Sequence, residues 1–375
     1  MSSLGLGLSE SEEQERQRRH RRRGRRAVGV ALVVVLLLVL GVVGAGFFAL
    51  RGLIPHGGPD DYPGPGTGQV QVEVNSGATL TAIGQTLAKA DVVASVGAFV
   101  DAAKANPDAA SVQPGVYALK QKMKASDAVS LLLDPKSRVQ EKVLLREGLR
   151  LKESLQTIAK ATDIPLADLQ AAAKDPAALG APDWAPKNNL EGFVFPATYT
   201  FKPGVKAQDV LTAAVKRFDQ AAKDTGLGSG ATIDGKRYTP LQILTVASIA
   251  EKEAPPADQA KVARVLYNRL DKGMKLQLDS TVSYATGKPG ITTSDQDRAS
   301  KSPYNTYVHE GLPPGPIDSP GENAIKAALN PADGPWLYFV TVNPDTGETK
   351  FAVTGAEHQK NVAEFQKWLR EHPGQ

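Results

Sequence analysis

The segment TPLQILTVASIAEKEA, residues 239–254, decides the fold of the larger part of this chain. It opens as a capping box, with Thr239 as N-cap, Pro240 at the first helical position and Gln242 three residues after the cap. From residue 241 to residue 250, apolar side chains fall on nearly all sides of the helix, and a helix of that kind belongs inside a domain. Two prolines follow at once. We therefore predict a buried central helix that ends near Ala254.

Glu251 lies near the C-terminal end of this predicted helix, on the same face as Leu244, Ala247 and Ser248. A carboxyl group held against small and apolar groups is desolvated, which raises its pKa toward the value that a general acid needs near neutral pH. In the alternative interpretation, Glu251-Lys-Glu253 is only the solvated end of a helix. Helix position alone favours this second interpretation, although a carboxylate near a helix C-terminus interacts unfavourably with the helix dipole.

Outward from this helix, the periodicity of the sequence predicts an α+β fold. Residues 70–74 alternate as in a half-buried strand, and apolar residues at helical spacing follow from residues 80 and 96. Together with a strand at 116–119, they predict a strand–helix–helix–strand unit of about 70 residues. The remaining predicted helices lie at 126–133, 151–162, 205–224, 258–272 and 356–371, and the remaining strands at 139–145, 336–342 and 349–353.

The N-terminal region predicts a membrane anchor. Residues 1–26 hold eight arginines and four glutamates, which accounts for the whole formal charge of +4, so a basic protein surface for nucleic acid is not indicated. Residues 27–50 carry no charge, and a helix of this length, roughly 36 Å, crosses a bilayer. The flanking arginines predict a cytoplasmic N-terminus and an extracytoplasmic C-terminal region. A cleaved signal peptide is the alternative, but its apolar region is normally shorter and ends in a small-residue cleavage site.

Several segments around the central helix carry a family resemblance. They are VARVLYNRL at 262–270, GMKLQLDST at 273–281, SPYNTY at 302–307, GLPPGPI at 311–317 and Glu357-His358, with Arg146-Glu-Gly148 and Leu190-Glu-Gly192 upstream. With ASIAEKEA, they resemble the MltG/YceG-like family of endolytic murein transglycosylases in their order, their spacing and the identity of their residues. The resemblance runs from about residue 70 to about residue 368.

The resemblance implies a membrane-anchored lytic transglycosylase that acts without metal or organic cofactor. The protein would cleave MurNAc–GlcNAc bonds in nascent peptidoglycan strands, leave 1,6-anhydro-MurNAc ends and terminate glycan elongation. The implied domains are a basic tail (1–26), a transmembrane helix (27–50), a Gly/Pro linker (51–69), a LysM-like module (70–140) and a catalytic domain (141–375). Its implied partners are peptidoglycan strands, the membrane, penicillin-binding proteins and glycan synthases.

Glu251 is the catalytic residue that the resemblance implies. The candidate sugar-binding residues follow the central helix and are Asn268, Gln277, Asp279, Thr281, Tyr304, Asn305 and Tyr307. For each of them, a role in capping or loop hydrogen bonding is an open alternative. Glu191 and Glu253 are expected to lie behind the residues that contact the substrate and to hold those residues in position. Ser280 and Leu278 depart from residues frequent in the family, which leaves the fine specificity open.

Other chemistries are disfavoured by the sequence. The chain has no cysteine, which excludes thiol catalysis, disulfides and cysteine-based metal sites. The five histidines lack H-E-x-x-H spacing, and no S-x-x-K motif of a penicillin-binding transpeptidase occurs. Two rival functions stay open, a catalytically silent peptidoglycan-binding scaffold and a hydrolytic muramidase, which would need a second carboxylate such as Asp279 or Glu253.

Overall fold

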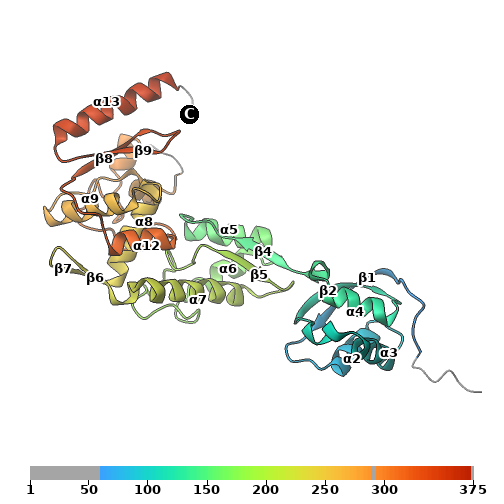
Figure 1. The fold of residues 1–375 in the computed structure, drawn as a ribbon. Helices are drawn as coiled ribbons and strands as arrows, with labels where there is room; N and C mark the ends of the chain where they lie inside the picture. Colours follow the sequence, from blue (N-terminus) through green and yellow to red (C-terminus); the bar gives the residue numbers. More distant parts are fainter. Residues whose placement is uncertain (1–59, 289–292, 373–375) are drawn as a thin grey trace, which may run out of the picture. The chain divides into compact units, whose positions relative to one another are not determined.

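The computed structural model describes residues 60–288 and 293–372 (Figure 1). The predicted membrane helix at 27–50 lies outside these ranges, as do residues 51–59 of the predicted linker. Among the described helices, none is long and apolar enough to cross a bilayer. The described chain divides into two compact units, and the division runs through two strands, β1 (Thr67–Val74) and β2 (Gly115–Gln121). The first unit contains the described residues up to Val70, together with Ala78–Val112 and Leu119–Leu133. The second unit contains Gln71–Gly77, Gln113–Ala118 and the described residues from Asp134 onward.

The first elements confirm the predicted strand–helix–helix–strand order. They are β1 (Thr67–Val74), α2 (Leu80–Lys89), α3 (Val96–Ala105), β2 (Gly115–Gln121) and α4 (Ala125–Leu133). Thr79 and Ser95 cap the two predicted helices by accepting hydrogen bonds from the amides of Ala82 and Ala98. A small sheet has the strand order β1–β2–β3, and β3 (Arg138–Val139) pairs antiparallel with β2.

A two-stranded antiparallel sheet opens the rest of the second unit. Strand β4 (Glu141–Leu144) pairs with β5 (Thr198–Phe201), with Glu141 opposite Phe201 and Leu144 opposite Thr198. Between these strands lie α5 (Leu151–Ala161) and α6 (Leu166–Ala172), and after them come α7 (Ala207–Thr225) and the hairpin of β6 (Ala231–Ile233) and β7 (Lys236–Tyr238). A large hydrophobic core joins these elements to the helices that follow.

Helix α8 (Pro240–Glu253) is the predicted central helix. All eight residues from Ile243 to Ala250 are buried. The capping box is formed as predicted: the Gln242 amide donates to Thr239 Oγ1 at 3.3 Å, and Gln242 Oε1 accepts from the Thr239 amide at 2.9 Å. Helices α9 (Gln259–Asp271) and α12 (Glu322–Leu329) pack against α8, as Figure 1 shows.

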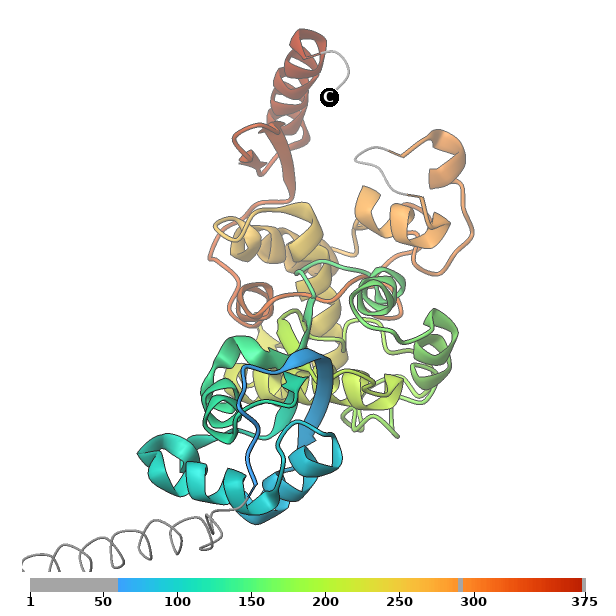
Figure 2. The same cartoon turned by 90° about the vertical axis from the view of Figure 1, so that its right-hand side faces the viewer.

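Elements after α9 complete the second unit. Helix α10 (Asp279–Thr286) contacts α8, and the short α11 (Asp295–Arg298) contacts α10; both lie in the orange part of Figure 2. The predicted hairpin is present as β8 (Tyr338–Asn343) and β9 (Glu348–Ala352), and the predicted C-terminal helix is α13 (Gly355–Glu371). Four helices were not predicted from the sequence, and all of them have eight residues or fewer: α6, α10, α11 and α12. So short a helix carries too few apolar positions to display a clear period.

Candidate active site

The last turn of α8 holds Glu251 against a loop from another part of the chain. Its side chain is half-buried, and Oε2 accepts a hydrogen bond from the Gly321 amide at 3.0 Å. Gly321 leaves room beside it for another carboxylate, since a Cβ at this position would lie 2.0 Å from Glu147 Oε1. Two acidic side chains, Glu147 and Glu251, thus meet at the start of α12.

Backbone amides link the loop before α12 to α8 and link the residues before α5 to that same loop. The Ile317 amide donates to the buried Ser248 Oγ at 3.0 Å. A short antiparallel bridge joins the same loop to the residues before α5: the Gly148 amide donates to Ser319 O, and the Ser319 amide donates to Leu149 O, both at 2.9 Å. Two of the segments that carried the sequence resemblance, 146–148 and 311–317, therefore lie beside the end of the central helix.

The backbone of Gly148 also lies close to Glu251 and Lys252. Its φ of +72° lies in the left-handed region, which favours glycine. A Cβ here would lie 3.5 Å from Lys252 Nζ and 3.6 Å from Glu251 Cγ, and Lys252 Nζ donates a hydrogen bond to Gly148 O. Backbone strain, more than lack of space, is therefore the reason for glycine at this position.

The environment of Glu251 raises the pKa of its carboxyl group. Burial is the main cause, and the nearby charge of Glu147 adds to it. The Gly321 amide, the charge of Lys252 and a hydrogen bond from Gln259 oppose the shift and lower the pKa in part. The raised pKa agrees with the sequence prediction; the catalytic role of Glu251 remains a prediction.

Glu191 is a second buried carboxyl group in the same unit. Only 5% of its surface is exposed, and burial raises its pKa to about 7. Its Oε1 accepts from the Leu151 amide at 2.7 Å and its Oε2 from the Tyr284 hydroxyl at 3.2 Å. The Tyr284 ring packs on Tyr304, with 4.7 Å between centroids, and the Arg150 guanidinium lies over Tyr284. Glu191 thus connects the start of α5 to the predicted sugar-binding residue Tyr304.

A cleft of about 480 Å³ opens next to Lys252 and Glu253. The side chain of Glu253 is half-buried, and burial raises its pKa, while hydrogen bonds from Ser280 oppose that shift. The cleft is polar and is formed by α5, α8, α10, β8 and the loop before α12. Its lining residues are Arg150, Glu153, Lys252, Glu253, Asp279, Ser280, Ser283, Gly287, Ile317 and Thr341.

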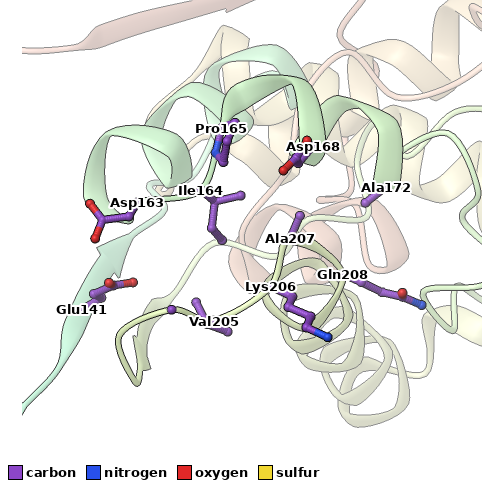
Figure 3. Close-up of a pocket in the computed structure, with 11 residues that line it drawn as sticks. Glu141, Asp163, Ile164, Pro165, Asp168, Ala172, Val205, Lys206, Ala207 and Gln208 are labelled. Carbon is purple, nitrogen blue, oxygen red and sulfur yellow. The ribbon is translucent and has the colours of Figure 1, made fainter.

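A second cavity of about 520 Å³ lies between β4, α6 and the start of α7, and Figure 3 shows the residues that line it. Its lining includes the acidic residues Glu141, Asp163 and Asp168 and the polar residues Lys206 and Gln208. No predicted site residue lines it, so the smaller cleft beside α8 is the better candidate for the active site. Among residues 60–288 and 293–372, no three His, Cys, Asp or Glu side chains are grouped as metal ligands.

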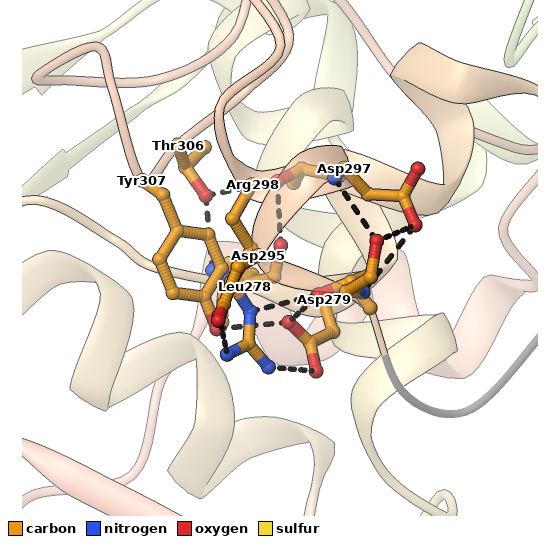
Figure 4. Close-up of polar contacts among 10 residues, drawn as sticks. Leu278, Asp279, Asp295, Asp297, Arg298, Thr306 and Tyr307 are labelled. Carbon is orange, nitrogen blue, oxygen red and sulfur yellow. Dashed lines mark hydrogen bonds and ion pairs between the residues drawn. The ribbon is translucent and has the colours of Figure 1, made fainter.

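Asp279, the first residue of α10, is surrounded by donors, as Figure 4 shows. Its Oδ1 accepts from Thr293 Oγ1 at 2.6 Å and from the Tyr307 hydroxyl at 2.8 Å, and its Oδ2 lies 3.4 Å from the Arg298 guanidinium. Burial and the hydrogen bond to Asp279 raise the pKa of Tyr307. The structure thus brings the predicted residues Asp279 and Tyr307 together.

Thr281 and Asn305 make hydrogen bonds inside the protein and are fully buried. Thr281 Oγ1 donates to Leu278 O at 2.7 Å and lies 2.8 Å from Thr306 Oγ1. Asn305 Nδ2 donates to Arg298 O at 2.9 Å and to Ser300 O at 2.7 Å. Thr281 thus links α10 to the loop before Tyr307, and Asn305 links the same loop to the end of α11.

Asn268 and Gln277 lie at the edges of this region. Asn268 Nδ2 donates to Gly334 O and Trp336 O, each at 2.9 Å, and so joins α9 to the segment before β8. Gln277 has an exposed side chain and a left-handed backbone, with φ of +50°. Neither residue is among those that line the cleft.

Sequence reasoning did not single out Arg150, Tyr284 or Asp318 as site residues. Arg150 follows the Arg146-Glu-Gly148 segment by two residues, and Tyr284 lies one turn after Thr281 on α10. Their neighbours in the sequence offered a signal, but only the folded chain brings the start of α5 and the end of α10 to Glu191.

Three kinds of comparison relate the chain to known proteins. The sequence profile of the YceG-like family matches residues 72–364. An endolytic murein transglycosylase of Bacillus subtilis is 32% identical over 306 residues, which cover 78% of this chain and 83% of the relative. One from Streptococcus pneumoniae is also 32% identical, over 79% of this chain but 58% of its own length. The crystal structure of a YceG-like protein from Listeria monocytogenes superposes with a TM-score of 0.53 and 32% identity, over 78% of this chain and 99% of that one.

Proposed function

This chain belongs to the YceG-like family, and on that premise we propose that it is an endolytic peptidoglycan lytic transglycosylase with Glu251 as its catalytic acid and base. The observation that carries the proposal is a carboxyl group with a raised pKa, held beside a polar cleft at the end of a buried helix. Such a group is protonated over a wider pH range than an ordinary glutamate, as a general acid must be.

The proposed reaction uses one carboxyl group twice. Glu251 first gives its proton to the oxygen of the MurNAc–GlcNAc bond, and the bond between that oxygen and C1 of MurNAc breaks. The 6-hydroxyl of the same MurNAc then attacks C1 and gives its proton to the Glu251 carboxylate. The product is a 1,6-anhydro-MurNAc end, and Glu251 regains its original protonation state without the consumption of water.

A muramidase and a silent scaffold are the competing functions. A muramidase needs a water molecule and a second carboxylate at a suitable separation, and Glu253 or Asp279 would have to act in that role. A scaffold would gain nothing from a desolvated carboxyl group, because burial of an acid costs stability unless hydrogen bonds compensate it. The relatives' description as endolytic murein transglycosylases supports the non-hydrolytic reaction.

The substrate strand is proposed to lie along the cleft beside Lys252 and Glu253. Asp279 lines this cleft, and the Tyr307 hydroxyl donates a hydrogen bond to Asp279. We assign Tyr304 a place beside the Glu191–Tyr284 pair, where an aromatic ring suits the apolar face of a sugar. Thr281, Asn305 and Asn268 are proposed to shape the cleft by holding its loops. Gln277, whose side chain is exposed, is proposed to contact the strand itself.

We further propose that residues 27–50 anchor the protein in the cell membrane, with its C-terminal region outside the cytoplasm. An uninterrupted apolar run after an arginine-rich tail supports this topology. Residues 70–140 are proposed to form a LysM-like glycan-binding module, as their strand–helix–helix–strand order suggests. Glycan synthases and penicillin-binding proteins, which work on the same strands in the same membrane, are the proposed partners.

Mass spectrometry of the cleavage products tests the reaction. The full chain in detergent is incubated with uncrosslinked nascent glycan strands, beside Glu251→Gln and Glu253→Gln variants. We expect anhydro-MurNAc ends from the wild type and none from Glu251→Gln. Reducing ends that vanish in Glu253→Gln would assign a muramidase instead. Strands that are bound but left uncut by the wild type would assign a scaffold.

A further inference from the structure

Arg150 lines the cleft beside α8 with a positive charge that no acid of the described chain pairs with. The residue directly precedes α5 and is half-buried. Among the described residues, its guanidinium donates no hydrogen bond and forms no ion pair. The guanidinium lies over the ring of Tyr284, with Cζ 5.6 Å from the ring centroid. A cation–π contact thus holds the planar group in place and leaves its N–H donors open.

The acids that line the cleft do not neutralise Arg150. Glu153 accepts a hydrogen bond from the backbone amide of Arg150 at 2.9 Å, but its carboxylate forms no ion pair with the guanidinium. Asp279 is paired with Arg298, as Figure 4 shows. Burial raises the pKa of Glu253, which favours its neutral form. The charge of Arg150 therefore remains open to a ligand in the cleft.

Two buried acids respond to the charge of Arg150 without forming an ion pair with it. Burial is the main influence on Glu191 and Asp318 and raises the pKa of both, that of Glu191 to about 7, whereas the charge of Arg150 lowers each in part. Lys252, the other cation that lines the cleft, donates a hydrogen bond to Gly148 O. Arg150 is therefore the better candidate for a cation that contacts the substrate.

The stability of α5 does not account for an arginine at this position. Arg150 is the N-cap residue of α5, and its side chain makes no capping hydrogen bond. Serine, threonine, aspartate and asparagine stabilise an N-cap, and a positive charge at a helix N-terminus interacts unfavourably with the helix dipole. Arg150 thus occupies a position where a cation costs stability and gains no ion pair. Binding of an anionic group explains this choice.

Arg150 also lies near the proposed catalytic acid. It follows Gly148 by two residues, and a Cβ on Gly148 would lie 3.6 Å from Glu251 Cγ. Two residues span at most about 7 Å of backbone. On the other side, the Tyr284 ring that supports Arg150 packs on Tyr304, with 4.7 Å between centroids. A sugar bound beside Glu251 is therefore within reach of the Arg150 side chain.

We propose that Arg150 is a specificity-determining residue that binds a carboxylate carried on the lactyl group of MurNAc. This proposal rests on the proposed function, because it takes a peptidoglycan strand as the occupant of the cleft. MurNAc differs from GlcNAc by a 3-O-lactyl ether that ends in a carboxyl group, and a stem peptide attached there ends in carboxylates of its own. A guanidinium matches a carboxylate with two parallel hydrogen bonds. Arg150 thereby distinguishes MurNAc from GlcNAc beside the bond that is cut.

The test is steady-state formation of anhydro ends by the full chain in wild-type and Arg150→Asn forms. Two substrates are used, a peptide-free strand with free lactyl carboxylates and a strand that carries stem peptides. Each is compared with a form in which its carboxylates are converted to neutral methylamides. The substitution should raise KM on a charged strand about tenfold, as the loss of a charge-assisted hydrogen bond predicts, and change kcat by less than about twofold. It should leave KM on the neutral strands unchanged.

The pattern across the strands identifies the source of the carboxylate. A rise in KM on the peptide-free strand assigns the contact to the lactyl carboxylate. A rise on the peptide-bearing strand alone assigns it to the stem peptide. No rise on either charged strand, or an equal rise on charged and neutral strands, would overturn the proposal.

Thermal unfolding of the same proteins separates binding from a structural role. Asparagine is a favourable N-cap, so Arg150→Asn should unfold at a temperature no lower than that of the wild type. Arg150→Lys keeps the charge without the planar fork, and its KM should lie between the other two. Arg217→Gln is the matched control, because Arg217 also lies over an aromatic ring, 4.7 Å from the centroid of Phe195, but does not line the cleft. An equal rise in KM in Arg217→Gln, or an Arg150→Asn protein that unfolds well below the wild type, would leave Arg150 with a structural role.

Direct binding keeps this proposal apart from the proposed function. Fluorescence anisotropy gives the Kd of a labelled charged strand and of its neutral form for Glu251→Gln, with and without Arg150→Asn. The charged strand should bind about tenfold more weakly when Arg150 is replaced, and the neutral strand should bind equally. A wild type that forms no anhydro ends would refute the proposed function, and this binding difference would still decide the role of Arg150. Equal Kd values for the charged strand in both proteins would contradict the carboxylate contact.

Discussion

The acids around Glu251 and the acids around Arg298 lie in the same unit but in opposite environments. Burial raises the pKa of Glu251, Glu191 and Asp318, although one backbone amide donates a hydrogen bond to Glu251 and another donates one to Glu191. Near Arg298, by contrast, hydrogen bonds from Lys288 and Ser294 lower the pKa of Asp297 to about 2. The comparison indicates that the pKa of an acid in this unit depends on its access to water and cations more than on the number of acids near it. Acids cut off from water keep their protons, and acids beside cations are ionised.

The largest expected effect is the loss of activity in Glu251→Gln. Removal of a general acid lowers the rate by about 10²–10⁴-fold, and the neutral amide should leave the thermal stability close to that of wild type. Asp279→Asn, in the network near Arg298, should show a smaller loss that appears mainly in KM. Steady-state kinetics on defined glycan strands measure both. Comparable losses of kcat in the two variants would mean that the acids around Glu251 and those around Arg298 contribute to the chemical step in the same way.

Glu191 gives the largest expected effect on stability. Its pKa of about 7 in the folded protein lies above the ordinary value of 4.5, so the folded state binds more protons than the unfolded state between these values. The contribution of Glu191 to the free energy of unfolding is therefore fully present below pH 4.5 and is lost as the pH rises through about 7. Relative to Glu191→Gln, the wild type should lose on the order of 3 kcal/mol between pH 4 and pH 8.

Chemical denaturation of the wild type and Glu191→Gln at both pH values tests this sign. If the wild type instead becomes more stable relative to Glu191→Gln as the pH rises, the folded state stabilises the ionised form of Glu191, as it does for Asp297.

Gly148→Ala should have an intermediate effect. The left-handed backbone costs an alanine roughly 1–2 kcal/mol, and its methyl group would lie against Lys252 and Glu251. Gly180→Ala is the matched control, because Gly180 also has a positive φ, +81°, but has open space around its Cβ position. Thermal unfolding should place the two variants close together, whereas anhydro-end formation should fall only in Gly148→Ala. Equal activity in both variants would show that the approach of Gly148 to Glu251 is unimportant for cleavage.

The smallest expected effect belongs to Asp297→Asn. Its ionised form is stabilised in the folded state, so its contribution is present above pH 3.8 and is lost as the pH falls through about 2. The aspartate is in contact with solvent and its partner Lys288 is exposed, so screening reduces the effect. A slight loss of stability at pH 7 that disappears in high salt is the expected outcome of thermal unfolding. A loss that persists in high salt would mean that this network is shielded from water as well.

Local signals in the sequence were sufficient for the long elements. The capping box at Thr239 and Gln242, the all-round apolar pattern of α8 and the hairpin of β8 and β9 were predicted and are present. Each depends on residues a few positions apart, and therefore on propensities that act before the chain is folded. Helix α12 escaped prediction, although its buried residues Ala324, Ile325 and Ala328 follow a helical spacing. Eight residues offer too little of that pattern to separate a helix from a loop.

Pairings between distant segments were outside the reach of local reasoning. Strand β5 meets β4 across the whole of α5 and α6, and Gly148 meets Ser319 across most of the second unit. Such contacts are stabilised only after loop-closure entropy has been overcome by the packing of other elements. The surroundings of Glu251 are made of these contacts, which is why Asp318 and Arg150 were not found beforehand.

The sequence by itself determined the central helix, the position of Glu251 at its end and the family to which the chain belongs, because each is written in residues close together along the chain. Only the tertiary structure decided which acids surround Glu251 and which of them are cut off from water. A pKa depends on burial and on neighbours in space. Those neighbours come from α8, the loop before α12, the residues before α5 and the segment before β5, and folding alone brings them to one place.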